Sequence, residues 1–265
     1  MSATSTVTSS DGTVIAAEQT GSGPSLVLVD PAAGFRGFGP LPPLVPRLAE
    51  RFTVVSYDRR GRGGSTDTVP YAVGREVEDL QAVIEAAGGE AFVFGYSSGA
   101  VLCLHAATSG VAIEKLVLFE PTVDLKGFPA DDTDLGTEIS KLVAAGRRGD
   151  AVEHFMASIG VPSEMREGMR EDPSWPGLEA LSHTLVYDTV VTSTLPTERL
   201  AKTSVPTLVL SSESSGDQLN GWARAVAEAL PDGSHRAMRG DWHGVAPEDM
   251  TAALAEFLIG ADDQE

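Results

Sequence analysis

The sequence predicts an α/β fold in which a mostly parallel central sheet is flanked by helices and carries a helical insertion. Two observations predict this fold. Short, continuous apolar runs recur along the chain between turn residues, as in strands that are buried on both faces. Segments with helical spacing separate these runs, and such alternation builds a sheet with helices on both faces.

The expected strands begin with a hairpin. Residues 4–19 predict two short strands around the turn "SSDG". Further apolar runs predict strands at 25–30, 52–58, 91–97, 115–121, 207–213 and 235–240. Helical spacing predicts helices at 42–52, 75–89, 97–110, 221–233 and 247–260.

One region interrupts the alternation. Between Pro121 and Ser204 no apolar run of comparable strength occurs, and the segments 134–160, 163–172 and 175–193 predict helices. We therefore expect a core formed by residues 1–121 and 204–265. Residues 122–203 are expected to form a helical cap inserted on that core.

Composition limits the classes of function. The chain has 265 residues, is 42% hydrophobic and carries a formal charge of −19, which argues against a nucleic-acid partner. No signal peptide and no run of about 18 apolar residues is present, so we expect no membrane partner and a cytoplasmic location. Cys103 is the single cysteine, and no histidine–carboxylate spacing indicates a metal, so no cofactor is expected.

The stretch "GYSSG" at residues 95–99 matches the pattern G-x-S-x-G directly after an apolar strand and before a helix. The chain must reverse sharply there, and glycines two positions on either side allow the strand and helix to approach. Only Ser97 has glycine at both positions. Ser97 is therefore the predicted nucleophile, while Ser98 has Tyr96 and Ala100 at those places.

On these residues the chain resembles the α/β-hydrolase fold superfamily, in particular small, cap-bearing serine hydrolases, over nearly its whole length. Other matching segments are "LVLVDPAAG", "YDRRGRGGS", "LVLFEP", "VPTLVLSSE" and "GDWHGVAPEDM". The resemblance implies cleavage of an ester or lactone of a small, largely apolar substrate through an acyl-enzyme. Two alternatives remain open: a non-hydrolytic or C–C bond-cleaving enzyme (lyase, cyclase or β-diketone hydrolase), and a non-catalytic small-molecule binder.

A serine hydroxyl needs a base, and imidazole suits this role near pH 7. Among five histidines, His243 lies between the last strand and the last helix, where the family carries its base. The acid is less obvious because Ser215 occupies the family's usual aspartate position. We favour Glu120 at a strand end, as in members resembling haloalkane dehalogenases, over the alternative Asp217, because a short reach orients an imidazole better.

The resemblance implies one oxyanion donor at the residue after the nucleophile and another in the segment after the first parallel strand, which reads "DPAAG" here. The oxyanion donors are expected to be the N–H groups of Ser98 and Ala32, with Ala33 next, because Pro31 has no N–H. A carboxylate at Asp30 would oppose a negative charge nearby, so we interpret it as a polar contact for the substrate. The candidate pocket residues are Asp30, Phe35, Tyr96, Trp175 and Trp242. The expected partner is a small-molecule substrate, and the sequence does not indicate an oligomeric state.

Overall fold

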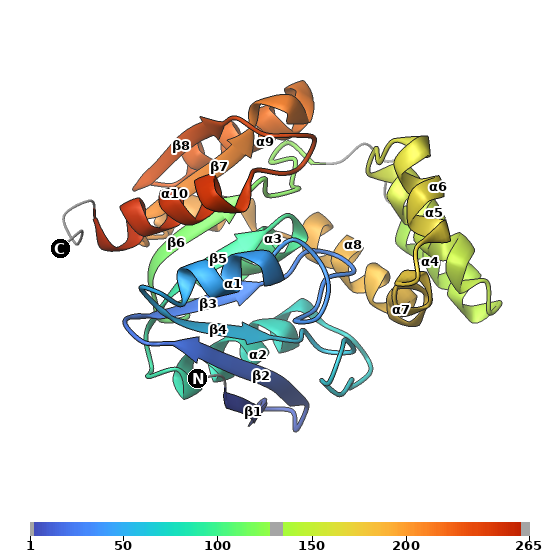
Figure 1. Cartoon of the computed structure of the whole chain (residues 1–265), viewed down its shortest axis with the longest axis horizontal. Coiled ribbons are helices and arrows are strands. Elements are labelled where there is room, and N and C mark those ends of the chain that lie inside the picture. Colours follow the sequence, from blue (N-terminus) through green and yellow to red (C-terminus); the bar gives the residue numbers. More distant parts are fainter. Residues whose placement is uncertain (1–2, 128–134, 261–265) are drawn as a thin grey trace.

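The computed structural model describes residues 3–127 and 135–260, and it contains one eight-stranded sheet in the order β1-β2-β4-β3-β5-β6-β7-β8 (Figure 1). The pairs β1–β2 and β2–β4 are antiparallel, and the other neighbours are parallel. The predicted fold class is confirmed. The strands are β1 (Ala3–Thr8), β2 (Val14–Gly21), β3 (Ser25–Val29), β4 (Thr53–Tyr57), β5 (Ala91–Tyr96), β6 (Ile113–Phe119), β7 (Thr207–Ser212) and β8 (Gly233–Met238).

Helices cover both faces of the sheet. The helices α1 (Val45–Leu48) and α10 (Pro247–Ile259) cover one face, while α2 (Val73–Ala86), α3 (Ser98–Thr108) and α9 (Gly216–Ala229) cover the other (Figure 1). Alternate residues of each central strand enter opposite clusters, as Leu26 and Leu28 do on one side and Val27 and Val29 on the other. Burial on both faces explains why the strands are continuous apolar runs.

The first expected helix, 42–52, is much shorter than its spacing indicates. A 3₁₀ turn at Pro42–Leu44 precedes the four residues of α1. Pro42, Pro43 and Pro46 have no N–H to donate, so the segment supports only these short turns. In contrast, α9 begins at Gly216, five residues before the helix expected at 221–233.

The segment between β6 and β7 is mostly helical from Leu135 to Ser193. It contains α4 (Leu135–Ala144), α5 (Arg148–Ser158), α6 (Ser163–Glu171), α7 (Trp175–Leu181) and α8 (Leu185–Ser193). In Figure 1, α4–α7 stand to one side of the sheet and α8 lies nearer to it. A separate apolar cluster forms among these helices, which we call the cap cluster: Ile139, Ala151, Val152, Phe155, Met156, Val161, Trp175, Leu178 and Leu185.

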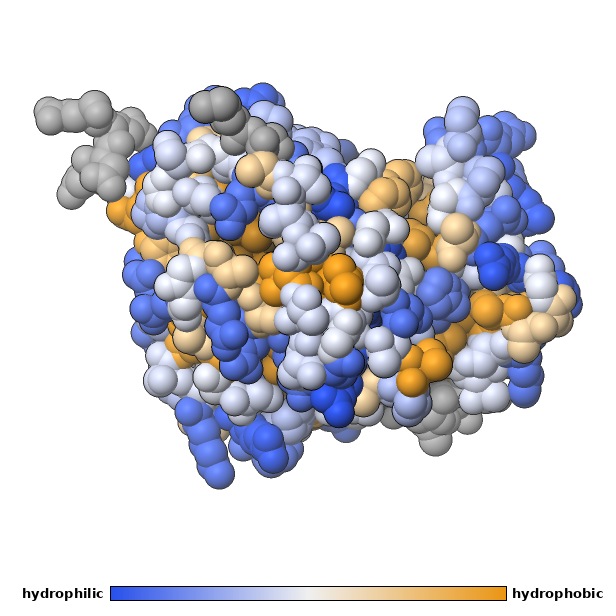
Figure 2. Space-filling view, turned by 90° about the horizontal axis from the view of Figure 1, so that it is seen from below, coloured by the Kyte–Doolittle hydropathy of each residue, from blue (hydrophilic) through white to orange (hydrophobic). Residues whose placement is uncertain are grey.

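The division into core and cap remains a prediction. Asp134, the first residue of one expected cap helix, lies outside the described residues, as do residues 1–2 and 261–265 of the expected core. No helix in the described ranges is long and apolar enough to cross a bilayer. The face seen from below in Figure 2 is mostly hydrophilic, with smaller apolar areas between polar side chains.

The register of the parallel strands brings the candidate residues to one edge of the sheet. Val29 pairs with Gly95, Tyr96 with Phe119, and Phe119 with Leu210. Residues that directly follow β3, β5 and β6 therefore lie side by side. Ligands bind at this carboxyl edge in open α/β sheets.

Candidate active site

Four non-glycine residues among those described have a left-handed backbone. Their φ angles are 60° at Ala33, 55° at Ser97, 43° at Glu120 and 52° at His243. A residue with a Cβ is strained in this region, and such strain clusters at functional sites. All four residues were candidates from the sequence, and each lies in a segment that follows a strand.

The turn between β5 and α3 leaves Ser97 partly exposed. A Cβ on Gly95 would lie 2.7 Å from both Ala100 Cα and Cys103 Sγ. A Cβ on Gly99 would lie 2.4 Å from the carbonyl oxygen of Val29. Both positions therefore require glycine, as the motif predicts.

His243 and Glu120 are in direct contact. The Nδ1 atom of His243 donates to Glu120 Oε2, and Glu120 Oε1 accepts the backbone N–H of Ser212 at 2.6 Å. The Glu120 side chain is fully buried, whereas that of His243 is 17% exposed. Asp217 lies exposed in the first turn of α9. Of the two candidate acids, the structure brings Glu120 to the imidazole.

The loop that carries His243 is held by three hydroxyl groups. The His243 N–H donates to Ser215 Oγ at 2.9 Å, and Ser212 Oγ donates to the carbonyl oxygen of Asp241 at 2.7 Å. The Tyr96 hydroxyl donates to the carbonyl oxygen of His243. Sequence reasoning treated Ser215 only as a missing acid; in the structure it anchors the histidine loop.

The loop after β3 presents the other expected oxyanion donor. The N–H of Gly34 donates to the carbonyl oxygen of Pro31 at 3.1 Å, which closes a tight turn around Ala32 and Ala33. No hydrogen bond between described residues uses the backbone N–H of Ala32 or Ser98. Both N–H groups are therefore free to donate to a substrate oxygen.

Comparison with known proteins identifies the family of this chain. The sequence profile of the alpha/beta hydrolase family matches residues 10–257. The chain belongs to this family. An alpha/beta hydrolase from Sphaerobacter thermophilus DSM 20745 is 48% identical, with 96% of this chain and 99% of that chain covered and a TM-score of 0.88.

Two further solved structures share the fold at low identity. An esterase from Rhodococcus sp. ECU1013 is 19% identical, with 96% of this hydrolase and 98% of the esterase covered and a TM-score of 0.71. The enol-lactonase from Burkholderia xenovorans LB400 is 18% identical, with 97% and 99% covered and a TM-score of 0.72.

Asp30 lies against Gly34 of its own loop in this hydrolase. Its side chain is buried, Oδ1 has no hydrogen-bond partner among the described residues, and a Cβ on Gly34 would lie 3.1 Å from that atom. Burial raises the pKa of Asp30 to about 7, against the opposing effect of Arg62 and Arg59. The carboxyl group of Asp30 thus lies against its own loop, and the expected polar contact with substrate stays a prediction.

The aromatic candidates occupy different places. Trp242 is half-buried, its ring lies 5.5 Å from that of His243, and it packs against the cap cluster. Trp175 is buried within the cap cluster. Phe35 stacks on Phe38 with ring centroids 6.2 Å apart. Tyr96 is only 6% exposed, and its ring lies 5.3 Å from that of His243, so both Trp242 and Tyr96 lie beside the histidine.

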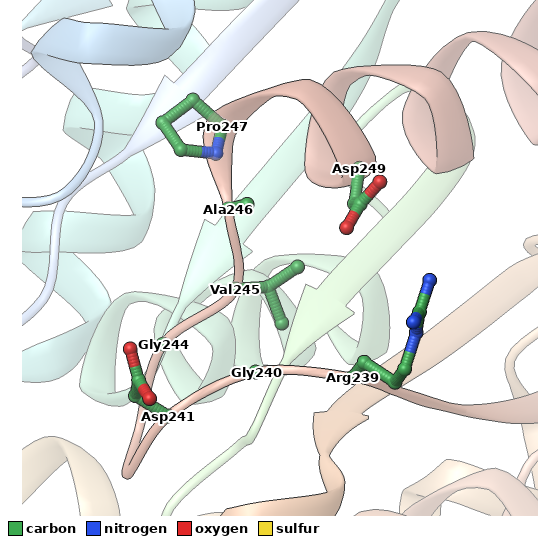
Figure 3. Close-up of a pocket in the computed structure, with 8 residues that line it drawn as sticks. All are labelled: Arg239, Gly240, Asp241, Gly244, Val245, Ala246, Pro247 and Asp249. Atoms are coloured by element: carbon green, nitrogen blue, oxygen red, sulfur yellow. The ribbon is translucent and has the colours of Figure 1, made fainter.

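An open hollow lies beside the histidine loop of the hydrolase (Figure 3). Its lining does not include Ser97, Glu120 or His243, so the candidate catalytic groups do not face it. In residues 3–127 and 135–260, no three His, Cys, Asp or Glu side chains are grouped as metal ligands are. The hollow is lined by Arg239, Gly240, Asp241, Gly244, Val245, Ala246, Pro247 and Asp249.

Proposed function

We propose that this chain is a serine hydrolase that cleaves an ester or lactone of a small, largely apolar substrate through an acyl-enzyme. The observation that carries the proposal is the contact of His243 with the buried carboxylate of Glu120, one strand away from the strained and partly exposed Ser97. The fold shared with an esterase and an enol-lactonase supports an ester or lactone carbonyl as the target.

The reaction begins when Ser97 Oγ attacks the substrate carbonyl carbon and its proton passes to His243 Nε2. Glu120 accepts the Nδ1–H bond of His243, which fixes the tautomer and stabilises the imidazolium that forms. The N–H groups of Ser98 and Ala32 donate to the oxyanion. These donors stabilise the charge as it develops.

Collapse of the tetrahedral intermediate breaks the bond to the leaving oxygen, which takes the proton from His243. In a lactone the leaving alcohol stays attached to the acyl group. Water then attacks the acyl-enzyme while His243 accepts its proton. The same proton returns to Ser97 Oγ when the acid is released, so the enzyme is regenerated.

The proposed preference for apolar substrates rests on apolar side chains in and beside the loop after β3, which we call the oxyanion loop. Ala32, Ala33, Phe38 and Trp242 pack against the cap cluster. An apolar acyl or alcohol group gains free energy by leaving water for such surroundings, whereas a charged group loses hydration without a partner. We therefore expect short and medium acyl esters to be cleaved faster than esters with charged acyl groups.

A fluorophosphonate probe tests the proposal because it reacts only with an activated serine. We expect one label per chain, on Ser97, together with turnover of p-nitrophenyl butyrate. Ser97→Ala abolishes both signals. Ser109→Ala, which changes an exposed serine at the end of α3, behaves as the unchanged protein.

Failure of the native chain to react, or equal labelling of Ser97→Ala, overturns the proposal. Turnover of another substrate that survives Ser97→Ala but not His243→Ala supports the non-hydrolytic or C–C bond-cleaving alternative. Absence of labelling together with tight binding of a small molecule supports the non-catalytic binder.

A further inference from the structure

A buried carboxylate on α8 binds two buried arginines of the core. Asp188 Oδ1 lies 2.8 Å from Arg59 Nη1, and its Oδ2 lies 2.7 Å from Arg62 Nη2. All three side chains are at most 1% exposed. Buried charges are costly unless they are paired with good geometry, so this cluster fixes its members in place.

The same carboxylate reaches the turn that carries the nucleophile. Ser98 Oγ donates to Asp188 Oδ1 at 2.8 Å. Burial alone would raise the pKa of Asp188, but Arg62 and Arg59 hold that pKa below its usual value. Asp188 therefore stays ionised and accepts hydrogen bonds from the serine and from both arginines.

The two arginines in turn hold the loop after β3. Arg62 Nη1 donates to the carbonyl oxygens of Pro31 at 2.6 Å and Gly34 at 3.2 Å. Arg59 Nη1 donates to the carbonyl oxygen of Asp30 at 3.2 Å. These carbonyl groups bracket Ala32 and Ala33. One carboxylate is thus connected to both segments that carry the free N–H groups.

Helix α8 is a fixed support for this carboxylate. His105 Nε2, on α3, donates to the carbonyl oxygen of Val191 at 2.9 Å, which gives a second bond between α3 and α8. Asp188 and Val191 lie three residues apart, about one turn of the helix. Both bonds join α8 to the helix that begins at the nucleophile turn.

We propose that Asp188 is a positioning residue that fixes the separation of the two oxyanion donors, Ser98 N–H and Ala32 N–H. This inference rests on the proposed serine hydrolase function. Donors stabilise an oxyanion only when they are held at hydrogen-bond distance from the place where it forms. A carboxylate from the inserted segment supplies this constraint through one serine hydroxyl on one side and two arginines on the other.

The test compares Ser98→Ala and Asp188→Asn with Tyr187→Phe. Ser98→Ala keeps the backbone N–H and removes only the bond to Asp188. We expect kcat for p-nitrophenyl butyrate to fall about 10- to 100-fold in both variants, with KM changed less than about threefold, because a misplaced donor weakens the transition state. We expect kcat of the double variant to fall no more than about threefold further, because both substitutions break the same link between Ser98 and Asp188.

Tyr187→Phe is the matched control. It lies on the same helix and removes a hydroxyl bond of 2.7 Å to Asp67, which does not touch the oxyanion segments. We expect Tyr187→Phe to keep kcat within about twofold, even where its Tm falls as much as that of Ser98→Ala. A purely structural role for Asp188 predicts losses of kcat that follow Tm across all the variants.

Amide hydrogen exchange gives a reading that does not need turnover. Faster exchange at residues 31–35 and 97–101 is expected in Ser98→Ala and Asp188→Asn, and not in Tyr187→Phe. Unchanged exchange there, or kcat within twofold of the unchanged protein in Ser98→Ala, overturns the inference. If the native chain neither turns over esters nor reacts with the fluorophosphonate, the proposed function fails, while the exchange data still decide whether Asp188 fixes the two segments. If Asp188→Asn does not fold, Ser98→Ala carries the test alone.

Discussion

The candidate catalytic residues and a cluster of buried arginines both contain buried carboxylates, but the two regions use them differently. We call Ser97, Glu120 and His243 the catalytic edge. All three have positive φ, and the serine and histidine are partly open to solvent. The arginine network comprises Arg59, Arg60 and Arg62 with their carboxylate partners Asp11, Glu76, Asp79 and Asp188, and its guanidinium groups are at most 1% exposed.

The difference lies in when charge is present. In the proposed reaction, positive charge forms on His243 only during turnover, so the imidazole needs one buried acceptor and an open path to the substrate. In the network, charge is permanent, and every guanidinium group has at least one carboxylate within hydrogen-bond distance. We therefore expect strain and exposure to accompany reactivity, whereas buried ion pairs accompany fixed geometry.

The largest effect is expected at Ser97. Ser97→Gly should lower kcat at least about 10⁴-fold because no other hydroxyl replaces the nucleophile. It should also raise the free energy of unfolding by about 1 kcal/mol relative to Ser97→Ala, since glycine accepts a φ of 55° without strain. Ester turnover and urea unfolding of both variants check this. Equal stability of the two variants would mean that the backbone at the catalytic edge is not strained.

The choice of acid predicts the next effect. Glu120→Gln keeps the shape of the side chain but favours the wrong imidazole tautomer, so kcat should fall about 10²- to 10⁴-fold. Asp217→Asn, on the exposed first turn of α9, should change kcat less than twofold. Steady-state kinetics with one ester measure both. A large loss in Asp217→Asn alone would assign the acid to that residue instead.

The part of the network that does not touch the site predicts a loss of stability without a loss of rate. Arg60 binds both oxygens of Asp79, at 2.7 and 2.8 Å, and does not contact the oxyanion loop. Asp79→Ala should lower the free energy of unfolding by about 3 kcal/mol, because it leaves a buried guanidinium group short of its partner.

Thermal unfolding should show a decrease in Tm of roughly 6–12 °C for Asp79→Ala. The kcat measured below the transition should stay within about twofold. Asp150→Ala, which breaks the exposed pair with Arg147, should lower the free energy of unfolding by no more than about 0.5 kcal/mol. A loss of kcat in Asp79→Ala would show that the whole network, and not only its Asp188 half, supports the site.

Local chemistry made much of the catalytic edge predictable from the sequence. The spacing of Gly95 and Gly99 around Ser97 reports a packing requirement that acts within a few residues, and the strand before it is a continuous apolar run. The end of the apolar run at Phe119 likewise places Glu120 at the sheet edge, because parallel strands end together.

The network was not predictable in the same way, because its contacts join residues far apart in the sequence. Asp188 lies 129 positions from Arg59, so no spacing rule relates them. A signal was nevertheless present: Asp188 is a lone carboxylate within "LVYDTVV", an apolar helical segment. A charge on such a face requires a buried partner, and the arginine-rich "DRRGR" after β4 supplies two.

Asp30 belongs to neither the catalytic edge nor the arginine network, and we expect its replacement to have the smallest effect, a change in stability that depends on pH. It is a buried carboxyl group like those of the network, but its Oδ1 has no partner among the described residues. Its pKa of about 7 in the folded chain, raised by burial, compares with 3.8 as the ordinary value. Between pH 4 and 7 the folded chain holds a proton that the unfolded chain has released, so this group lowers stability as pH rises. The loss is complete above about pH 7 and absent below about pH 4.

Asp30→Asn removes this dependence, because its amide never ionises. We expect the variant to exceed the unchanged protein by about 1–2 kcal/mol in the free energy of unfolding at pH 8, and by nearly nothing at pH 4. The gain is partial because the asparagine amide also lacks a buried partner. Urea unfolding across this pH range measures the difference, and Asp217→Asn serves as the exposed control. A difference that grows toward low pH would show that Asp30 is ionised and paired in the folded state, as the carboxylates of the network are.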